Sequence, residues 1–116
     1  MARAPKILQA RFYHTPGGAE PVREWLKGLD EEDRRQIGID IRKVEFGWPI
    51  GMPTCKPLGR GLWEVRTDLC SNRIARVIFA ISDGEMGLLH GFIKKTRKTP
   101  DDDLKLALKR KKEMEP

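Results

Sequence analysis

The segment LWEVRTDLCSNRIARVIFAISDGEMGLLHGFIKK (residues 62–95) decides the fold, because three strand-like runs follow one another in it. The runs cover residues 62–67, 73–81 and 86–95, and aliphatic, β-branched and aromatic residues dominate each of them. The Asp-Gly pair at residues 83–84 is typical of a two-residue hairpin turn. Sequential strands with such short connections predict an antiparallel meander.

One strand and two helices are expected before this meander. A weakly alternating run at residues 6–14 predicts a first strand. Apolar residues at i, i+3, i+4 and i+7 from Val22 predict a short helix that begins near Pro21. Asp30 is a suitable N-cap for a second helix over residues 31–46, which has acidic residues in its first turn.

The most clearly marked helix is expected at residues 99–113. Thr99 is its predicted N-cap, Pro100 suits the first helical position, and three aspartates follow where the helix dipole favours negative charge. Between the second helix and the meander, residues 47–61 are crowded with Gly and Pro. They predict a long loop with a short extended piece around residues 56–58.

A chain of 116 residues can bury one modest hydrophobic core. We therefore expect a single α+β domain over residues 1–116, in the order β-α-α-β-β-β-α, with helices packed on the meander sheet. No apolar run approaches the roughly 20 residues that span a bilayer, and the N-terminus lacks a secretory signal, so a cytoplasmic protein is expected. Cys55 and Cys70 should stay reduced, and no Cys/His spacing predicts a zinc site.

The excess positive charge is concentrated in the second half of the chain. The net charge is +6. Residues 1–55 hold nine Lys/Arg and eight acids (+1), residues 56–98 hold nine and four (+5), and residues 99–116 hold five and five. The excess therefore coincides with the meander, and it favours a polyanionic partner.

Side-chain alternation places several charged groups on chosen faces of the strands. Glu64 and Arg66 share one face of their strand, Arg76 interrupts an apolar face of the next, and His90 and Lys94 share a face of the last. Cations on adjacent strands repel one another unless an anion joins them. The pattern predicts a shared hollow that fits a sugar–phosphate chain.

Three motifs resemble the HigB-like, phage-derived branch of the RelE/ParE toxin superfamily. They are GLWEVR (61–66), RIARVIF (73–79) and LLHGFIKKTRKTP (88–100), and a charged helix follows the last. The resemblance extends over residues 20–113 and implies a RelE-like fold. It also implies a toxin of a type II toxin–antitoxin module that binds the ribosome and cleaves messenger RNA. A 2′-hydroxyl would attack the adjoining phosphate and leave a 2′,3′-cyclic phosphate and a 5′-hydroxyl, with no metal or other cofactor. The implied partners are the ribosome, mRNA and a cognate antitoxin, commonly a helix-turn-helix DNA-binding protein, and no membrane.

The resemblance also assigns roles to residues of this chain. Arg76 and Lys95 would stabilise the reacting phosphate, Arg66 would position the RNA, and Glu64 would take the 2′ proton. A second set of cations would bind the substrate around them: Arg73, Lys94, Arg97, Lys56 and Arg60.

Several alternatives stay open at this point. Relatives place a Tyr or His near the end of the last strand or on the final helix, but nothing after His90 is either residue here, so the general acid and base are open. Glu64 and Arg66 are alternatively an exposed cross-strand ion pair, and Arg76 a structural arginine paired with a buried acid. The alternative functions are a ParE-like toxin that inhibits a protein such as gyrase without hydrolysis, and a non-catalytic nucleic-acid-binding phage protein.

Overall fold

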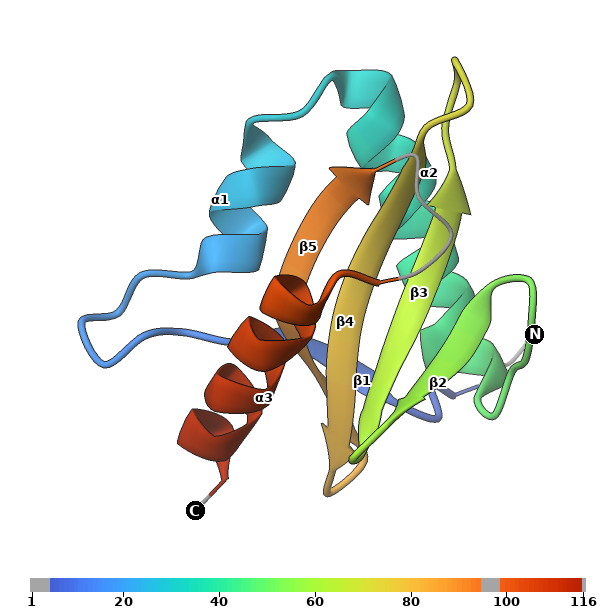
Figure 1. Cartoon of the computed structure of the whole chain (residues 1–116). Helices are drawn as coiled ribbons and strands as arrows, with labels where there is room; N and C mark the ends of the chain where they lie inside the picture. The colour runs from blue at the N-terminus through green and yellow to red at the C-terminus, as the bar shows by residue number, and fades with distance from the viewer. Residues whose placement is uncertain (1–4, 95–98, 116) are drawn as a thin grey trace.

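A five-stranded sheet with helices on both faces forms the structure, a computed structural model that describes residues 5–94 and 99–115. Helices α1 (Pro21–Lys27) and α2 (Glu31–Gly47) cover one face, and α3 (Asp101–Met114) crosses the other (Figure 1). The strands are β1 (Gln9–Phe12), β2 (Cys55–Gly59), β3 (Leu62–Asp68), β4 (Ile74–Ser82) and β5 (Glu85–Lys94).

The spatial order of the strands is β1-β5-β4-β3-β2. The expected meander of β3, β4 and β5 is confirmed, and its strands pair antiparallel. The β4–β5 turn consists of Asp83 and Gly84, both with positive φ (50° and 74°), as a two-residue turn of type I′ requires. Strand β1 adds to the free edge of β5 in parallel, so the sheet is mixed.

The predicted loop at residues 47–61 needs correction. Its extended piece is a full edge strand, β2, which pairs antiparallel with β3. Helix α2 also continues through Gly47, where the sequence predicted the start of the loop. The observed order is therefore β-α-α-β-β-β-β-α, with one strand more than expected.

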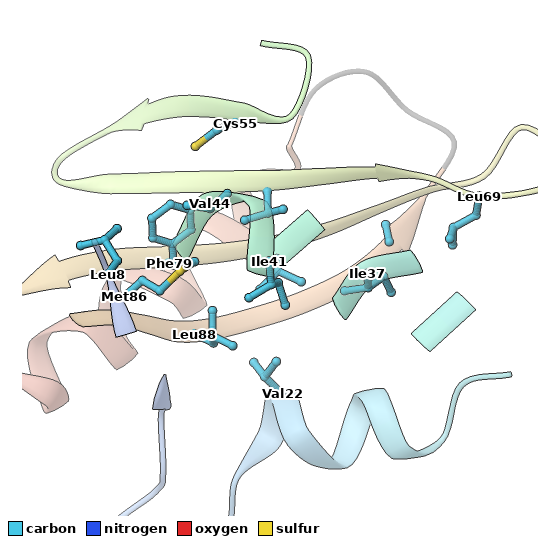
Figure 2. Close-up of a cluster of buried hydrophobic side chains, with 13 residues drawn as sticks. Leu8, Val22, Ile37, Ile41, Val44, Cys55, Leu69, Phe79, Met86 and Leu88 are labelled. Carbon is cyan, nitrogen blue, oxygen red and sulfur yellow. The ribbon is translucent and has the colours of Figure 1, made fainter. Parts of the chain in front are cut away.

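The main hydrophobic core lies between the sheet and helices α1 and α2 (Figure 2). Ile37, Ile41 and Val44 form the inward stripe of α2, and they pack in the same cluster as Phe79 and Met86. Burying one such side chain stabilises the fold by about 1.5–3 kcal/mol. A second, smaller cluster lies under α3 and contains Leu62, Ile78, Leu89 and Ala107.

The start of α3 differs from the prediction. The helix begins at Asp101, and Pro100 rather than Thr99 is the N-cap residue, without a side-chain hydrogen bond. Thr99 is instead buried, with 4% of its surface exposed. Its hydroxyl points to the sheet, where it takes part in the site described below.

A β-bulge in β5 helps to attach α3. The pairing of β4 and β5 shifts between Ile78 and Phe79, so Leu89 is an extra residue opposite them. The extra residue of a bulge has no partner opposite it in the strand pairing. The Nη1 of Arg110 on α3 donates to the carbonyl oxygen of Leu89 at 2.8 Å, which satisfies this acceptor.

Both cysteines are free thiols. Cys55 is buried in the main core, and burial, with a smaller contribution from the charge of Glu64, raises the pKa of its thiol to about 11. Cys70 is exposed. Among the helices in residues 5–94 and 99–115, none is long and apolar enough to cross a membrane.

Two glycines provide opposite tests of this packing. A Cβ at Gly91 would lie 2.4 Å from two ring carbons of Trp25, whereas a Cβ at Gly38 on α2 would meet nothing within 4 Å. We expect Gly91→Ala to lower the free energy of unfolding by about 1–3 kcal/mol, because the indole ring must move. Gly38→Ala should raise it by about 0.5–1 kcal/mol through helix propensity. Urea denaturation measures both, and equal effects of the two substitutions would contradict the packing of α1 on β5.

Candidate active site under helix α3

Glu64, Arg66 and Arg76, three of the predicted charged residues of the meander, meet on the face of the sheet that α3 covers. Arg66 on β3 pairs in register with Arg76 on β4, and Arg76 pairs with Phe92 on β5. In the neighbouring row, Glu64 is opposite Ile78, which is opposite His90. The strand faces inferred from alternation are therefore confirmed.

One carboxylate lies between two guanidinium groups in this cluster. The Oε1 atom of Glu64 is 3.9 Å from the Nε of Arg66 and 4.0 Å from the Nε of Arg76. Glu64 is 1% exposed and Arg76 is 0% exposed, whereas the side chain of Arg66 keeps 19% of its surface exposed. The cluster thus carries two positive charges and one negative charge, with only Arg66 reaching the surface.

Burial also changes the acidity of the inner guanidinium. Loss of solvent lowers the pKa of Arg76 from its ordinary value, while the adjacent Glu64 carboxylate opposes the shift. A buried guanidinium of this kind depends on its carboxylate, because removing either partner leaves an uncompensated buried charge.

Thr99 joins the two buried groups. Its hydroxyl donates to Oε2 of Glu64 at 2.5 Å, and its Oγ1 accepts from Nη1 of Arg76 at 3.4 Å. Sequence reasoning missed this role, since a Thr-Pro pair before acidic residues is a strong helix-start signal and its partner lies 35 residues away. No local pattern in the sequence indicates such a contact.

A second polar cluster lies beside the first, at the start of α3. Asp103 accepts from His90 Nε2 at 2.6 Å and from Lys94 Nζ at 3.1 Å. Burial alone would raise the pKa of Asp103, but the hydrogen bonds from His90 and Lys94 outweigh it, so its pKa lies below the ordinary value. Phe92 stacks on the His90 ring, with centroids 5.4 Å apart, and Lys94 Nζ lies 5.5 Å from the Phe92 centroid. His90 therefore lies beside α3 with a carboxylate partner, and its ring is not part of the apolar core.

Arg73 lies apart from these clusters. Its Nη1 and Nη2 donate to the two carboxylate oxygens of Asp33 on α2, at 2.8 and 3.1 Å. This two-pronged pair ties the β3–β4 turn to the start of α2, on the opposite face from α3. The structure does not bring Arg73 to Arg66 and Arg76, as the predicted grouping required.

Of the remaining predicted cations, those that the structure describes lie on or beside the α3 face. Lys56 on β2 is half-buried and lies opposite Glu64 in the strand register. Arg60 is exposed in the β2–β3 turn and lines a groove of about 340 Å³ between that turn and α3. Lys94 is exposed at the end of β5 and engaged by Asp103, and Lys95 and Arg97 lie outside the described residues.

The predicted open hollow needs correction. Arg66 and Arg76 are adjacent and share one carboxylate, as a common site requires. Glu64 and Arg76, however, are covered, with Thr99 bonded to both, so the cluster is closed in this structure. Within residues 5–94 and 99–115, no three His, Cys, Asp or Glu side chains gather as a metal site would need.

The sheet is mixed, with α1 and α2 on one face and α3 over a group of cations on the other. This arrangement is compatible with a RelE-like α+β domain. The family model described as "Phage derived protein Gp49-like (DUF891)" matches residues 24–112, from α1 almost to the end of α3. The chain therefore belongs to this family, which is a RelE/HigB-like toxin family of toxin–antitoxin systems. No curated protein matches the chain.

The Asp33–Arg73 pair makes the stability of the protein depend on pH. The hydrogen bonds from Arg73 hold the pKa of Asp33 below its ordinary 3.8. A carboxylate with a depressed folded-state pKa contributes stability that is fully present above about pH 4 and is lost as pH falls through the folded-state value. We expect the free energy of unfolding to fall below pH 4, and this acid dependence to be weaker in Asp33→Asn. Urea titrations between pH 2.5 and 7 measure it.

Asp68→Asn is the matched control, because Asp68 is an exposed aspartate at the end of β3. Its acid dependence should equal that of the wild type. If Asp33→Asn also retains the full wild-type dependence, the pair does not stabilise the folded state.

Proposed function

We propose that this chain is the toxin of a HigB-like type II toxin–antitoxin module, and that it cleaves messenger RNA on the ribosome. The family membership supports a toxin with an antitoxin partner. The observation that carries the cleavage mechanism is the sharing of Glu64 by Arg66 and Arg76 on two adjacent strands. A base and cations are two of the three kinds of group that metal-independent cleavage of a phosphodiester needs, and the third is a proton donor for the leaving 5′ oxygen.

In the proposed reaction, Glu64 takes the proton of a ribose 2′-hydroxyl, and the resulting oxygen attacks the adjoining phosphorus. Arg76 and Arg66 stabilise the negative charge that develops on the phosphate oxygens. The bond from phosphorus to the 5′ oxygen breaks, and the departing oxygen takes a proton from water and leaves as a 5′-hydroxyl. Lys95 is a further proposed phosphate ligand. Arg60, Lys56 and Lys94 lie on the same face of the sheet and are proposed to hold the flanking RNA backbone.

Access to this site requires a change at the start of α3. Arg66 and Lys94 reach the surface, but Glu64 and Arg76 do not. RNA chemistry at the buried pair therefore requires Thr99 to leave it. The free protein would then be a closed form, and binding to the ribosome and its mRNA would select an open form.

The burial of the pair also favours a second candidate function. If the cluster stays closed, Glu64 and Arg76 form a structural ion pair whose burial needs both partners. The chain would then act without hydrolysis, as a toxin that binds and inhibits a protein such as gyrase.

Arg66→Ala tests the first proposal, because Arg66 is the accessible member of the cluster and its removal leaves the buried pair in place. We expect ribosome-dependent cleavage to fall by about 10²–10³, the usual effect of losing one group that stabilises transition-state charge. Purified protein is added to a reconstituted translation reaction, and the 5′ ends of the mRNA fragments are mapped and tested for a free 5′-hydroxyl.

Arg35→Ala is the control, since Arg35 is an exposed arginine on α2 that bonds Glu32. It should cleave as the wild type does. A wild-type protein that stops growth but leaves translated mRNA intact, with Arg66→Ala equally toxic, would refute cleavage and support the second candidate.

A further inference from the structure

The contacts of Thr99 imitate those of a reacting ribose. A hydroxyl group donates its proton to a carboxylate oxygen of Glu64 at 2.5 Å, while a guanidinium nitrogen of Arg76 donates to the same hydroxyl oxygen at 3.4 Å. In the proposed reaction the proton of a ribose 2′-hydroxyl goes to Glu64. Arg76, besides stabilising the phosphate, would also donate to the 2′ oxygen as that oxygen gains negative charge, so the 2′-hydroxyl would make the same two contacts.

We propose that Glu64 and Arg76 form a binding subsite for the ribose 2′-hydroxyl, and that the Thr99 hydroxyl occupies this subsite in the free protein. The inference rests on the proposed ribonuclease function. It adds an internal competitor for the substrate and a structural basis for choosing RNA over DNA.

Burial shows that the two hydroxyl groups exclude each other. Thr99 is 4% exposed, Glu64 is 1% exposed and Arg76 is fully buried. An incoming ribose therefore reaches Oε2 of Glu64 only after Thr99 has left. Arg66 lies 3.9 Å from the same carboxylate and is partly exposed, so it marks the side from which the adjoining phosphate enters.

The exchange of one hydroxyl for another conserves hydrogen bonds. Oε2 of Glu64 keeps a donor and Nη1 of Arg76 keeps an acceptor in both states, so the exchange itself loses no hydrogen bond. Thr99 lies two residues before α3 and outside every strand, so its departure breaks no backbone ladder. A deoxyribose lacks the 2′-hydroxyl, and its binding would leave Glu64 without the donor that Thr99 supplies. Sites built to hydrogen-bond a hydroxyl reject analogues that lack it.

The first test separates the hydroxyl of Thr99 from its volume. Thr99→Val keeps the shape and removes the donor, whereas Thr99→Ser keeps the donor. If Thr99 competes with the substrate, Thr99→Val lowers KM for mRNA cleavage about fivefold and leaves kcat unchanged. A fivefold change in an equilibrium constant corresponds to the loss of about one ordinary hydrogen bond. Thr99→Ser should match the wild type. Thr67 is a buried threonine on β3, so Thr67→Val is the control and should also match the wild type.

The opposite outcome is equally clear. An unchanged or higher KM in Thr99→Val overturns the inference, and so does a lower kcat that Thr99→Ser restores. In the latter case the hydroxyl supports the catalytic groups instead of competing with the substrate.

The second test needs neither a stable variant nor turnover. Wild-type protein with ¹³C-labelled threonine methyl groups is titrated with the dinucleotide UpA and with its 2′-deoxyuridine analogue. The inference predicts that the Thr99 methyl resonance shifts with UpA and stays in place with the deoxy analogue, while the Thr67 resonance stays in place with both. Equal shifts with both ligands, or no shift with UpA, overturn it. A Thr99 shift in a protein that cleaves no mRNA would sink the ribonuclease function and leave the subsite standing.

Discussion

The burial of the Arg76–Glu64 pair constrains which groups can lie against the sheet on the α3 side of the molecule. Removing two charges from water costs several kcal/mol per ion, and their mutual attraction offsets this only with further hydrogen bonds. Here Thr99 supplies the added donor for Glu64 and an acceptor for Arg76. Thr99, two residues before α3, must therefore lie over β3 and β4. The other face of the sheet packs mainly as an apolar core.

Polar contacts at the two ends of α3 add to the apolar packing under the helix. Its apolar stripe is narrow, and of its residues only Ala107 is fully buried. Asp103 near its start bonds His90 and Lys94. Near its end Glu113 accepts from the hydroxyl of Tyr13, and this hydrogen bond, with burial, raises the pKa of the phenol. Tyr13, the only tyrosine, thus anchors the last turns of the helix. Polar contacts can be exchanged for others at little cost, which is compatible with a site that opens.

Much of the fold and half of the cluster could be predicted from local patterns. Alternation along the strands placed Glu64 and Arg66 on one face, and the short turns made β3 and β4 neighbours, so the meeting of Arg66 with Arg76 followed. Thr99 could not be found in this way. Its neighbours in sequence indicate a helix cap, and tertiary packing overrides that preference because Glu64 needs a donor.

The amino-acid sequence by itself determined which segments become strands and helices and which side chains share a face, because both depend on residues a few positions apart. It also determined the family to which the chain belongs and the excess of positive charge in the meander segment. Only the tertiary structure decided which polar and charged side chains pair with each other. Arg73 joins Asp33 across 40 residues, and Thr99 joins Glu64 across 35. Such pairings depend on how the turns and helices set distant segments beside one another, and no local periodicity encodes that distance.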